Sequence, residues 1–483
     1  MRVLENLEPQ KVFYYFEELC QIPHGSGNVE KISDYLKEFA RNRGLEVIQD
    51  EMKNIIIVKE ATAGYEKEPP VMIQGHMDMV AVHKPEYDID MSRDALKLVV
   101  SGDQIYAEGT SLGGDDGIAV AYALAILDDD NIKHPRLEIV ITVDEETGMD
   151  GARAIDLSML KAKRLLNIDS EEEGVFLTGC AGGARVNCSL RPQFVYRKGL
   201  VYEVTIGGLQ GGHSGVEIKE ERGNANILTG RLLWNLNQQD VTVGVISIQG
   251  GLADNAIPRE TRIALVVEPA DRERFEAKIK EFEAGVRTEL RTKDPGFFVQ
   301  VEDKEKGEVP AVCDKELSRL AAFLHSLPNG VQAMSADVQG LVETSLNLGI
   351  LSLNEQGCHA SFSVRSSIES SKQALIEKLK AIVSLTDGET EVSGVYPGWA
   401  YRVDSPLRDK MLDLYEKMYG EKPKVEAIHA GLECGILTAK RKDLDCISFG
   451  PNIYNIHTTE EYLSIASVER VWRYLLRFLE EKD

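Results

Sequence analysis

Five short stretches of the sequence combine histidines and carboxylates in a way that could hold metal ions. The side chains concerned are His76, Asp115, Glu146, Asp169 and His457. Most of them follow an apolar run directly, which predicts a position at the end of a buried strand. Imidazole and carboxylate ligands without a thiolate suit a catalytic zinc site, with cobalt or manganese as possible substitutes.

Two of these stretches also have an ordinary structural explanation. A histidine such as His76 can cap the end of a strand, and the pair Asp115 and Asp116 can cap a helix and interact favourably with its dipole. In the metal-binding interpretation one carboxylate bridges two cations, and the glycines on both sides allow a close approach of the backbone. Taken alone, each stretch is compatible with both explanations.

Three consecutive acids, Asp144, Glu145 and Glu146, follow the apolar run 139–143. Burying like charges together is costly unless a cation neutralises them. Neighbouring glutamates can divide the work, because one can bind metal while the other takes a proton from a metal-held water. This favours a functional site over a solvated turn. The acids Glu171–Glu173, by contrast, look like an ordinary solvated run.

The elements that must position these residues alternate between helices and short apolar strands. Strands are expected at 54–58, 71–75, 137–143 and 164–168, and helices at 9–22, 29–43, 118–127, 405–419 and 466–481. Asn28 is the candidate N-cap of the second helix, and Gly44 its stop. This alternation predicts an α/β domain with a mostly parallel central sheet and flanking helices.

The pattern changes near residue 184, where strands become more charged and more regularly alternating. Long charged helices, such as 271–292 and 372–385, come between these strands. We therefore expect an inserted α+β lid domain with antiparallel sheet at 184–396, with room for two similar α+β units. The catalytic domain would then comprise residues 1–183 and 397–483.

Bulk composition excludes several classes of protein. The 483 residues carry 55 Lys and Arg against 79 Asp and Glu, a net charge of −24. That field repels nucleic acids and anionic membrane surfaces. The chain has no secretory signal and no apolar run of about 18 residues that could span a membrane. Seven scattered cysteines without a CxxC pair indicate reduced thiols, Cys313 among them, in a cytoplasmic protein.

The order and context of these motifs resemble one family over nearly the whole chain. It is the co-catalytic two-zinc metallopeptidase family, which includes aminoacyl-histidine dipeptidases (Xaa-His dipeptidases, carnosinase-like), tripeptide aminopeptidases and aminoacylases. The stretches most similar to the aminoacyl-histidine dipeptidase branch are QGHMDMV, LGGDDGIAVA, VDEETGMDGA, NIDSEEEG, GGLQGGHSG, GGLADNAIPRE and NIHTTEEY.

The resemblance implies a ligand set of two Zn²⁺ per chain. One zinc would be held by His76 and Asp169, the other by Glu146 and His457, and Asp115 would bridge them. The carboxylate of Asp78 would orient the His76 ring. Where the branch often has Asn, this chain has Asp116, which we expect to face away from the metals. A cis peptide bond between Asp115 and Asp116 is also implied.

The same resemblance implies hydrolysis of dipeptides, such as β-alanyl-histidine or a broader set. Glu145 would deprotonate a zinc-bridging water that attacks the peptide carbonyl, and His213 would stabilise the oxyanion. The substrate-binding positions would be Asn255, Arg365, Gly431 and Glu433. A doubled lid would let His213 act within its own chain. We expect a homodimer, the commonest soluble oligomer.

Three alternatives to a dipeptidase stay open. A sibling hydrolase is the nearest: a tripeptide aminopeptidase, a carboxypeptidase or an N-acyl amino acid amidase. A non-catalytic paralogue would keep the fold, although the chain retains five candidate ligands and Glu145. An acidic α/β protein without any metal site is the third, and metal analysis would test it.

Overall fold

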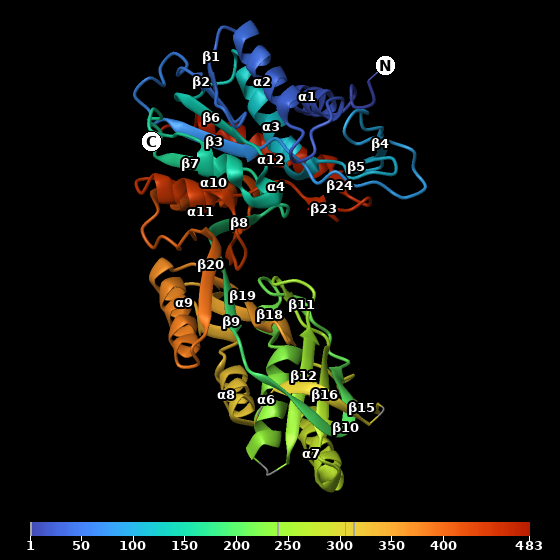
Figure 1. Cartoon of the computed structure of the whole chain (residues 1–483). Coiled ribbons are helices and arrows are strands. Elements are labelled where there is room, and N and C mark those ends of the chain that lie inside the picture. The colour runs from blue at the N-terminus through green and yellow to red at the C-terminus, as the bar shows by residue number, and fades with distance from the viewer. Residues whose placement is uncertain (1, 239–240, 305, 313) are drawn as a thin grey trace. The chain divides into compact units, whose positions relative to one another are not determined.

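The computed structural model describes residues 2–238, 241–304, 306–312 and 314–483, which divide into two compact units (Figure 1). The first unit comprises Met1–Gly179, Tyr401–Ala427 and Leu432–Asp483, and the second comprises Cys180–Ala400 and Ile428–Gly431. The predicted boundaries at 183/184 and 396/397 lie within four residues of these. The four residues 428–431 were not predicted to join the second unit.

An eight-stranded mixed sheet forms the centre of the first unit. Its strands, in spatial order, are β1 (Glu46–Gln49), β2 (Ile55–Lys59), β6 (Leu137–Thr142), β3 (Val71–His76), β7 (Arg164–Asn167), β22 (Asp445–Ser448), β8 (Val175–Cys180) and β21 (Lys424–Ile428). The four strands β6, β3, β7 and β22 run parallel, whereas β1, β2 and β8 pair antiparallel with their neighbours. The mostly parallel central sheet is thus confirmed for the strands that carry the candidate ligands.

Helices flank this sheet. They are α1 (Gln10–Cys20), α2 (Glu30–Asn42), α3 (Gly114–Leu127), α4 (Glu145–Gly148), α5 (Asp150–Ala154), α10 (Pro406–Tyr419), α11 (Glu433–Lys440) and α12 (Ile465–Glu480). Every residue of α3 is buried, because its sequence is apolar all round and it packs between β3 and α1. The N-cap prediction for α2 was wrong. Val29 precedes the helix, and Asn28 instead donates to the carbonyl of Ser92.

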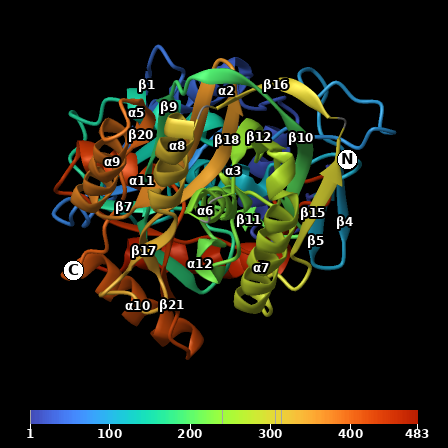
Figure 2. The ribbon, with the colours of Figure 1, turned by 60° about the horizontal axis from the view of Figure 1, so that its bottom comes forward.

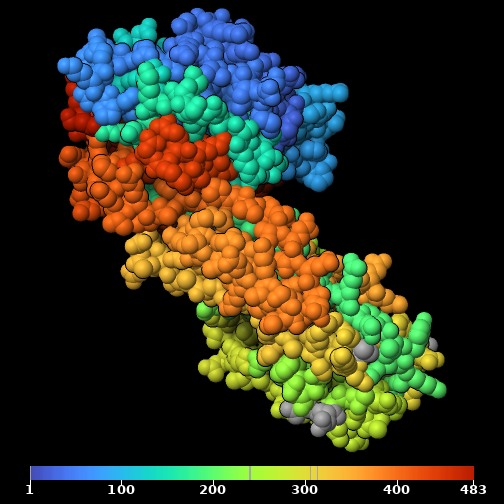
Figure 3. Space-filling model, turned by 60° about the vertical axis from the view of Figure 1, so that its left-hand side comes forward, coloured from blue at the N-terminus to red at the C-terminus, as the bar shows by residue number. Residues whose placement is uncertain are grey.

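Both ends of the chain build the first unit. Figure 3 shows blue N-terminal and red C-terminal atoms side by side on its surface. A small sheet also joins the two ends, in the order β23 (Ile453–Tyr454), β24 (Tyr462–Ser464), β5 (Gln104–Ala107) and β4 (Leu98–Ser101). The turn between β4 and β5 lies at Gly102 and Asp103, as predicted.

A ten-stranded antiparallel sheet forms the second unit. Its main path is β15 (Phe298–Asp303), β10 (Phe194–Gly207), β14 (Thr261–Val267), β12 (Val243–Gly250), β18 (Val342–Asn354), β19 (Gly357–Ser366), β9 (Gly182–Leu190) and β20 (Glu389–Tyr396). Off this path, β16 (Gly307–Val312) pairs with β10 and β17 (Gly330–Met334) with β18. A separate two-stranded ladder joins β11 (Gly212–His213) to β13 (Ala256–Ile257).

The two halves of this sheet share one topology. In each half, the first strand along the chain lies between the third and the fourth, and the second strand lies at the junction of β12 with β18. Two α+β units of similar topology would give this order. Four helices pack on the strands, α6 (Ala225–Gln238), α7 (Arg272–Leu290), α8 (Asp314–Ser326) and α9 (Glu369–Ser384). Figure 2 shows all four on the same side of the strands.

Short 3₁₀ turns complete the second unit at Ile218–Glu220 and Pro269–Asp271. Six cysteines are buried and form no disulfide within the described part of the chain, whereas Cys313 lies outside the described residues. Among the residues that the structure describes, no helix is both long enough and apolar enough to cross a membrane.

Candidate metal centre

Three adjacent parallel strands of the first unit carry the candidate ligands to one edge of the sheet. His76 ends β3, Glu145 and Glu146 follow β6 in α4, and Asp169 follows β7. Because β6, β3 and β7 are neighbours and parallel, their carboxyl ends meet at the same edge. The apolar strands themselves are almost entirely buried, which places these polar side chains at the rim of the core.

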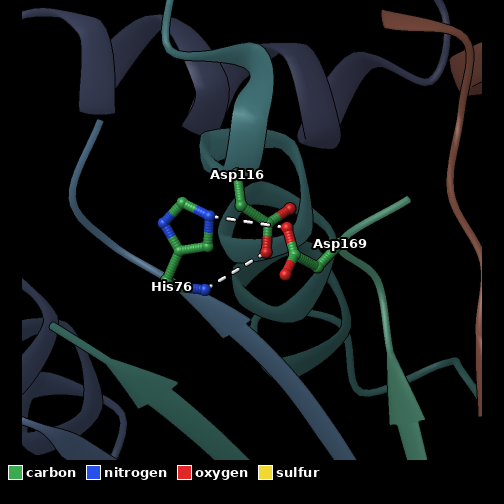
Figure 4. Close-up of side chains that lie close together, drawn as sticks. All are labelled: His76, Asp116 and Asp169. Carbon is green, nitrogen blue, oxygen red and sulfur yellow. Dashed lines mark hydrogen bonds and ion pairs between the residues drawn. The ribbon is translucent and has the colours of Figure 1, made fainter. Parts of the chain in front are cut away.

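His76 lies at the centre of the cluster and is 1% exposed. Its Nδ1 donates to the carbonyl oxygen of Asp78 at 2.8 Å, which leaves Nε2 to face the carboxylates. That Nε2 lies 3.1 Å from Oδ1 of Asp115 and 3.4 Å from Oδ1 of Asp169. Figure 4 shows the carboxylates of Asp116 and Asp169 close together on one side of His76, Asp169 facing its ring and Asp116 its backbone N–H.

Asp115 connects the two histidines. While its Oδ1 faces His76, its Oδ2 lies 3.2 Å from Nε2 of His457, a residue 342 positions further along the chain. The same His457 nitrogen lies 3.0 Å from Oε2 of Glu146. One carboxylate therefore separates two groups of possible ligands, His76 with Asp169 and His457 with Glu146. The peptide bond between Asp115 and Asp116 is cis, as the resemblance implied.

Asp78 holds the histidine strand and the glutamate turn together. Its carboxylate accepts the backbone N–H of Glu145 at 3.1 Å, that of Glu146 at 3.4 Å and the hydroxyl of Ser26 at 2.8 Å. The backbone carbonyl oxygen of Asp78 lies 2.8 Å from Nδ1 of His76, whereas its carboxylate lies 3.5 Å from the same nitrogen. Asp78 thus orients the ring through its main chain and the α4 turn through its side chain.

The surroundings of both histidines stabilise positive charge. Burial opposes protonation of His76, but hydrogen bonds to Asp115 and Asp169 outweigh burial and raise its pKa well above the ordinary value. Hydrogen bonds to Asp115 and Glu146 raise the pKa of His457 to about 10. The same carboxylates that favour a proton on each ring also favour a divalent cation in its place. The ring must be neutral to bind that cation.

The carboxylates themselves are crowded. Burial, together with the charges of Asp115 and Glu146, raises the pKa of Asp169 to about 6. Burial also raises the pKa of Glu145 well above the ordinary value, and the charges of Asp169, Glu433 and Glu146 add to this effect. Oε1 of Glu146 is buried and has no hydrogen-bond partner among the described residues. A carboxylate oxygen that has no hydrogen-bond partner and lies among like charges is suited to bind a cation.

The prediction that Asp116 faces away from the cluster was wrong. Its carboxylate accepts the backbone N–H of His76 at 3.1 Å and is 1% exposed. Potential ligand atoms of His76, Asp116 and Asp169 lie within 4.8 Å of one another, as do those of His76, Asp115 and Glu146. The backbone departs from helical dihedral angles at Asp115 and Asp116, with ψ of 105° and 30°, and both carboxylates lie near His76 at the end of β3.

Beneath the cluster lies a buried polar network that the sequence analysis missed. The carboxylate of Glu433 accepts hydrogen bonds from Gln74 at 2.5 Å and from Thr142 at 2.6 Å, and Asn167 donates to Gln74 at 2.6 Å. Glu433 is fully buried, which favours support of the strands over contact with a substrate. The signal was present in the sequence, because Gln74, Thr142 and Asn167 interrupt otherwise apolar strands.

In the second unit the structure gathers a different set of candidate residues. The Nδ1 of His213 accepts the backbone N–H groups of Gly215 at 3.2 Å and Val216 at 3.3 Å. These two bonds place the proton of the neutral ring on Nε2. Burial and the charge of Arg365 lower the pKa of His213, so the ring is a neutral N–H donor.

Arg365 and His429 belong to the same unit, and each has one buried nitrogen without a hydrogen-bond partner among the described residues. Arg365 is 9% exposed and donates to the hydroxyl of Tyr396 at 3.2 Å, while its Nε has no partner among the described residues. His429 bonds to the hydroxyl of Ser345 at 2.7 Å, and burial with the charge of Arg365 lowers its pKa to about 4. Neither Ser345 nor His429 is among the predicted substrate-binding residues, although His429 begins the segment that contains Gly431 and Glu433.

The remaining predicted substrate residues, Asn255 and Gly431, also lie in the second unit. Asn255 is exposed, and its backbone carbonyl accepts the N–H of Ser214 at 2.8 Å. Gly431 ends the short segment that contains His429. Their substrate-binding role stays a prediction.

Comparison with known proteins agrees with this fold and gives the family. The chain matches the model of peptidase family M20/M25/M40 over residues 72–481. It is 35% identical over 483 residues to the cytosol non-specific dipeptidase of Escherichia coli (strain K12), a match that covers 100% of this chain and 99% of the relative. The chain therefore belongs to peptidase family M20/M25/M40, which confirms the resemblance inferred from the motifs.

Solved structures give the same result. The aminoacylhistidine dipeptidase from Vibrio alginolyticus is 34% identical with a TM-score of 0.93, and the match covers 99% of this chain and 98% of that chain. The aminopeptidase PepT from Bacillus cereus ATCC 10987 is 17% identical with a TM-score of 0.56, over 98% of each chain. That second similarity concerns the fold alone. Within the family, the more similar relatives are dipeptidases by name.

Proposed function

We propose that this protein is a metallodipeptidase that holds two divalent cations, zinc in the first place, at the cluster of the first unit. The observation that carries the proposal is the position of Asp115, whose two carboxylate oxygens face His76 and His457 separately. His76 and Asp169 would hold one cation, Glu146 and His457 the other. The nitrogen and oxygen donors suit zinc, and cobalt or manganese as substitutes.

Two cations bound there would lower the pKa of a water and polarise the substrate carbonyl. The base of the reaction is Glu145, which lies beside this cluster on the α4 turn that Asp78 fixes. Its carboxylate is the one member of the glutamate pair that no described histidine contacts, so it is free to accept a proton. Glu145 takes the proton from the attacking water and passes it to the leaving amine.

The second unit supplies groups of the opposite character. His213 is a neutral donor through Nε2, which suits stabilisation of the oxyanion that forms during attack. Arg365 keeps part of its guanidinium without a partner among the described residues, which suits a substrate carboxylate. Asn255 and Gly431 would contribute to the same substrate site.

A dipeptide is the substrate that best fits these groups, because its single peptide bond lies close to both a free amine and a free carboxylate. The names of the relatives support this class, since one is a non-specific dipeptidase and another an aminoacylhistidine dipeptidase. We further propose a cytoplasmic location, as in the name of the Escherichia coli relative, and a homodimeric assembly.

A substrate panel on zinc-loaded enzyme tests the proposal. It should include β-alanyl-histidine, several α-dipeptides, a tripeptide, and N-acetyl and C-amidated forms of one dipeptide. Rapid hydrolysis of free dipeptides, with much slower cleavage of the tripeptide and of both blocked forms, is the expected result. Preference for the tripeptide would indicate an aminopeptidase, and preference for the N-acetyl substrate an amidase, and either result would overturn the proposal.

A further inference from the structure

Glu461 is a buried acid to which the proposed reaction assigns no task. It is 3% exposed and lies between His457 and β24. Its carboxylate accepts backbone N–H groups from four consecutive residues. The distances are 2.8 Å from Leu112 and 3.1 Å from Gly113 to Oε2, and 2.8 Å from Gly114 and 3.4 Å from Asp115 to Oε1.

Two of these N–H groups, those of Gly114 and Asp115, lie in the first turn of helix α3 and need an acceptor, and the other two lie just before it. The first N–H groups of a helix have no partner within the helix. A side chain at the N-cap position usually supplies one, but Gly113 occupies that position and no side-chain cap is present there. Glu461 provides the acceptor from 346 to 349 residues further along the chain. Its negative charge also interacts favourably with the helix dipole.

Local packing explains why the loop cannot cap itself. Gly113 has a φ of +71°, and a Cβ there would lie 2.7 Å from the sulfur of Met79. At Gly114 a Cβ would lie 3.3 Å from Oε1 of Glu461 itself. A side chain would be strained at Gly113 and would crowd Glu461 at Gly114, so the capping group comes from elsewhere.

The capped helix start is also the segment that presents the metal ligands. Asp115, the fourth of the residues bound by Glu461, faces both His76 and His457 with its carboxylate. On the other side, Glu461 is four residues beyond His457, and β24 begins directly after it and pairs with β5 and β23. One side chain therefore joins the Asp115 segment to the His457 segment.

We propose that Glu461 is a positioning residue for the metal centre, which fixes the backbone of Asp115 relative to His457. The inference rests on the proposed metal site. It goes further because it states that Glu461, which binds no cation itself, sets the distance between two of the ligands. Because Asp115 serves both cations, loss of the anchor weakens the binding of both, and not of one alone.

The test compares zinc affinity in two matched variants, Glu461→Gln and Glu138→Gln, by chelator competition on folded protein. Glu138 is also fully buried and accepts backbone N–H groups, from Lys161 and Ala162 at 2.9 Å, but these precede β7 and contact no ligand. We expect Glu461→Gln to bind both zinc ions about 10- to 100-fold more weakly, the usual effect of losing an outer partner of a metal ligand. Glu138→Gln should keep wild-type affinity even if it melts at a lower temperature.

The outcomes separate this inference from the proposed function. Wild-type affinity in Glu461→Gln overturns the inference and leaves the metal site intact, whereas an absence of zinc binding by wild-type protein overturns the proposed function itself. If Glu461→Gln does not fold, Glu461→Asp takes its place, because it keeps the charge but is one methylene too short to reach all four N–H groups. Weakened zinc binding in this variant supports the inference. If both variants fail to fold, or if Glu138→Gln loses zinc to the same extent, the role of Glu461 is structural and the inference is wrong.

Discussion

The two units of this protein gather opposite kinds of buried polar groups. At the sheet edge of the first unit, carboxylates outnumber the histidines that contact them, and one oxygen of Glu146 has no partner among the described residues. In the second unit, Arg365 and two histidines with lowered pKa values present N–H donors, with few acids in contact with them. A cation suits the first set and an anion the second, and this difference underlies the proposed roles of the two sets.

The largest effect should come from the base in the acidic unit. Glu145→Gln removes the proton acceptor without removing a contact to either histidine, so we expect kcat to fall by about 10²- to 10⁴-fold. Zinc content should stay at the wild-type level. Glu146→Gln is the matched control, and it should lower zinc content as well, because Glu146 contacts His457 at 3.0 Å. Turnover of Glu145→Gln close to wild type would remove Glu145 from the mechanism.

Metal removal should destabilise the acidic unit, since its carboxylates then repel one another. Elemental analysis of saturated protein should find about two zinc equivalents per chain, as a two-metal site requires. Each bound ion should stabilise the fold by about 2.7 kcal/mol when free zinc is about 100 times its Kd. Denaturant unfolding with zinc and with a chelator measures this difference. Saturation at one equivalent with full activity would contradict the two-cation site.

The cationic set in the second unit should act mainly on substrate affinity. Arg365→Gln removes the guanidinium that is proposed to bind the substrate carboxylate, and we expect KM to rise by about 100-fold with a smaller change in kcat. A C-amidated dipeptide provides the control, because it lacks the carboxylate and should react equally with wild type and variant. An equal loss on both substrates would mean that Arg365 supports the fold and does not bind the substrate.

The smallest effect concerns acid stability, which His429 should influence. Its pKa is about 4 in the folded protein against 6.5 ordinarily, so the unfolded chain binds the proton first as the pH falls. The contribution of His429 to the free energy of unfolding therefore keeps its full value above pH 6.5 and falls as the pH drops toward 4. The loss due to His429 is about 1 kcal/mol between pH 7 and 5.5. Urea unfolding in chelator should show a shallower pH dependence for His429→Gln than for wild type. Identical slopes would contradict this.

The sequence predicted the fold class and its strands well, because apolar runs such as 55–59 and 137–142 have no other stable place than a buried sheet. Adjacent acids directly after such runs predicted the candidate site, because the end of a buried strand places them together at the edge of the sheet. Contacts between distant segments were not predictable. The four N–H groups on Glu461 leave no local pattern, and the polar residues in the apolar strands indicate a buried network without identifying Glu433 as its acceptor. These contacts depend on how the two ends of the chain meet.

The solvated run predicted at Glu171–Glu173 is found at Glu172 but not at its two neighbours, for a similar reason. Glu173 pairs with Arg470 through two bonds of 2.6 Å, and burial raises the pKa of Glu171 to about 8. Both effects come from C-terminal segments that pack over this loop, since the Ile453 N–H bonds to the Glu171 carbonyl. Three adjacent glutamates are usually exposed; Glu172 remains so, whereas C-terminal segments distant in sequence partly cover Glu171 and Glu173.

Construction of the first unit from both chain ends sets an order of events during translation. The second unit is almost continuous in sequence, so its strands are all available once Tyr396 has left the ribosome. The first unit must wait for β22 to complete its parallel strands, for His457 to complete its ligand cluster and for Glu461 to bind the N–H groups beside Asp115. A nascent or prematurely terminated chain therefore presents Asp115 without its later partners. Hydrolytic competence arises only after almost the entire polypeptide has been synthesised.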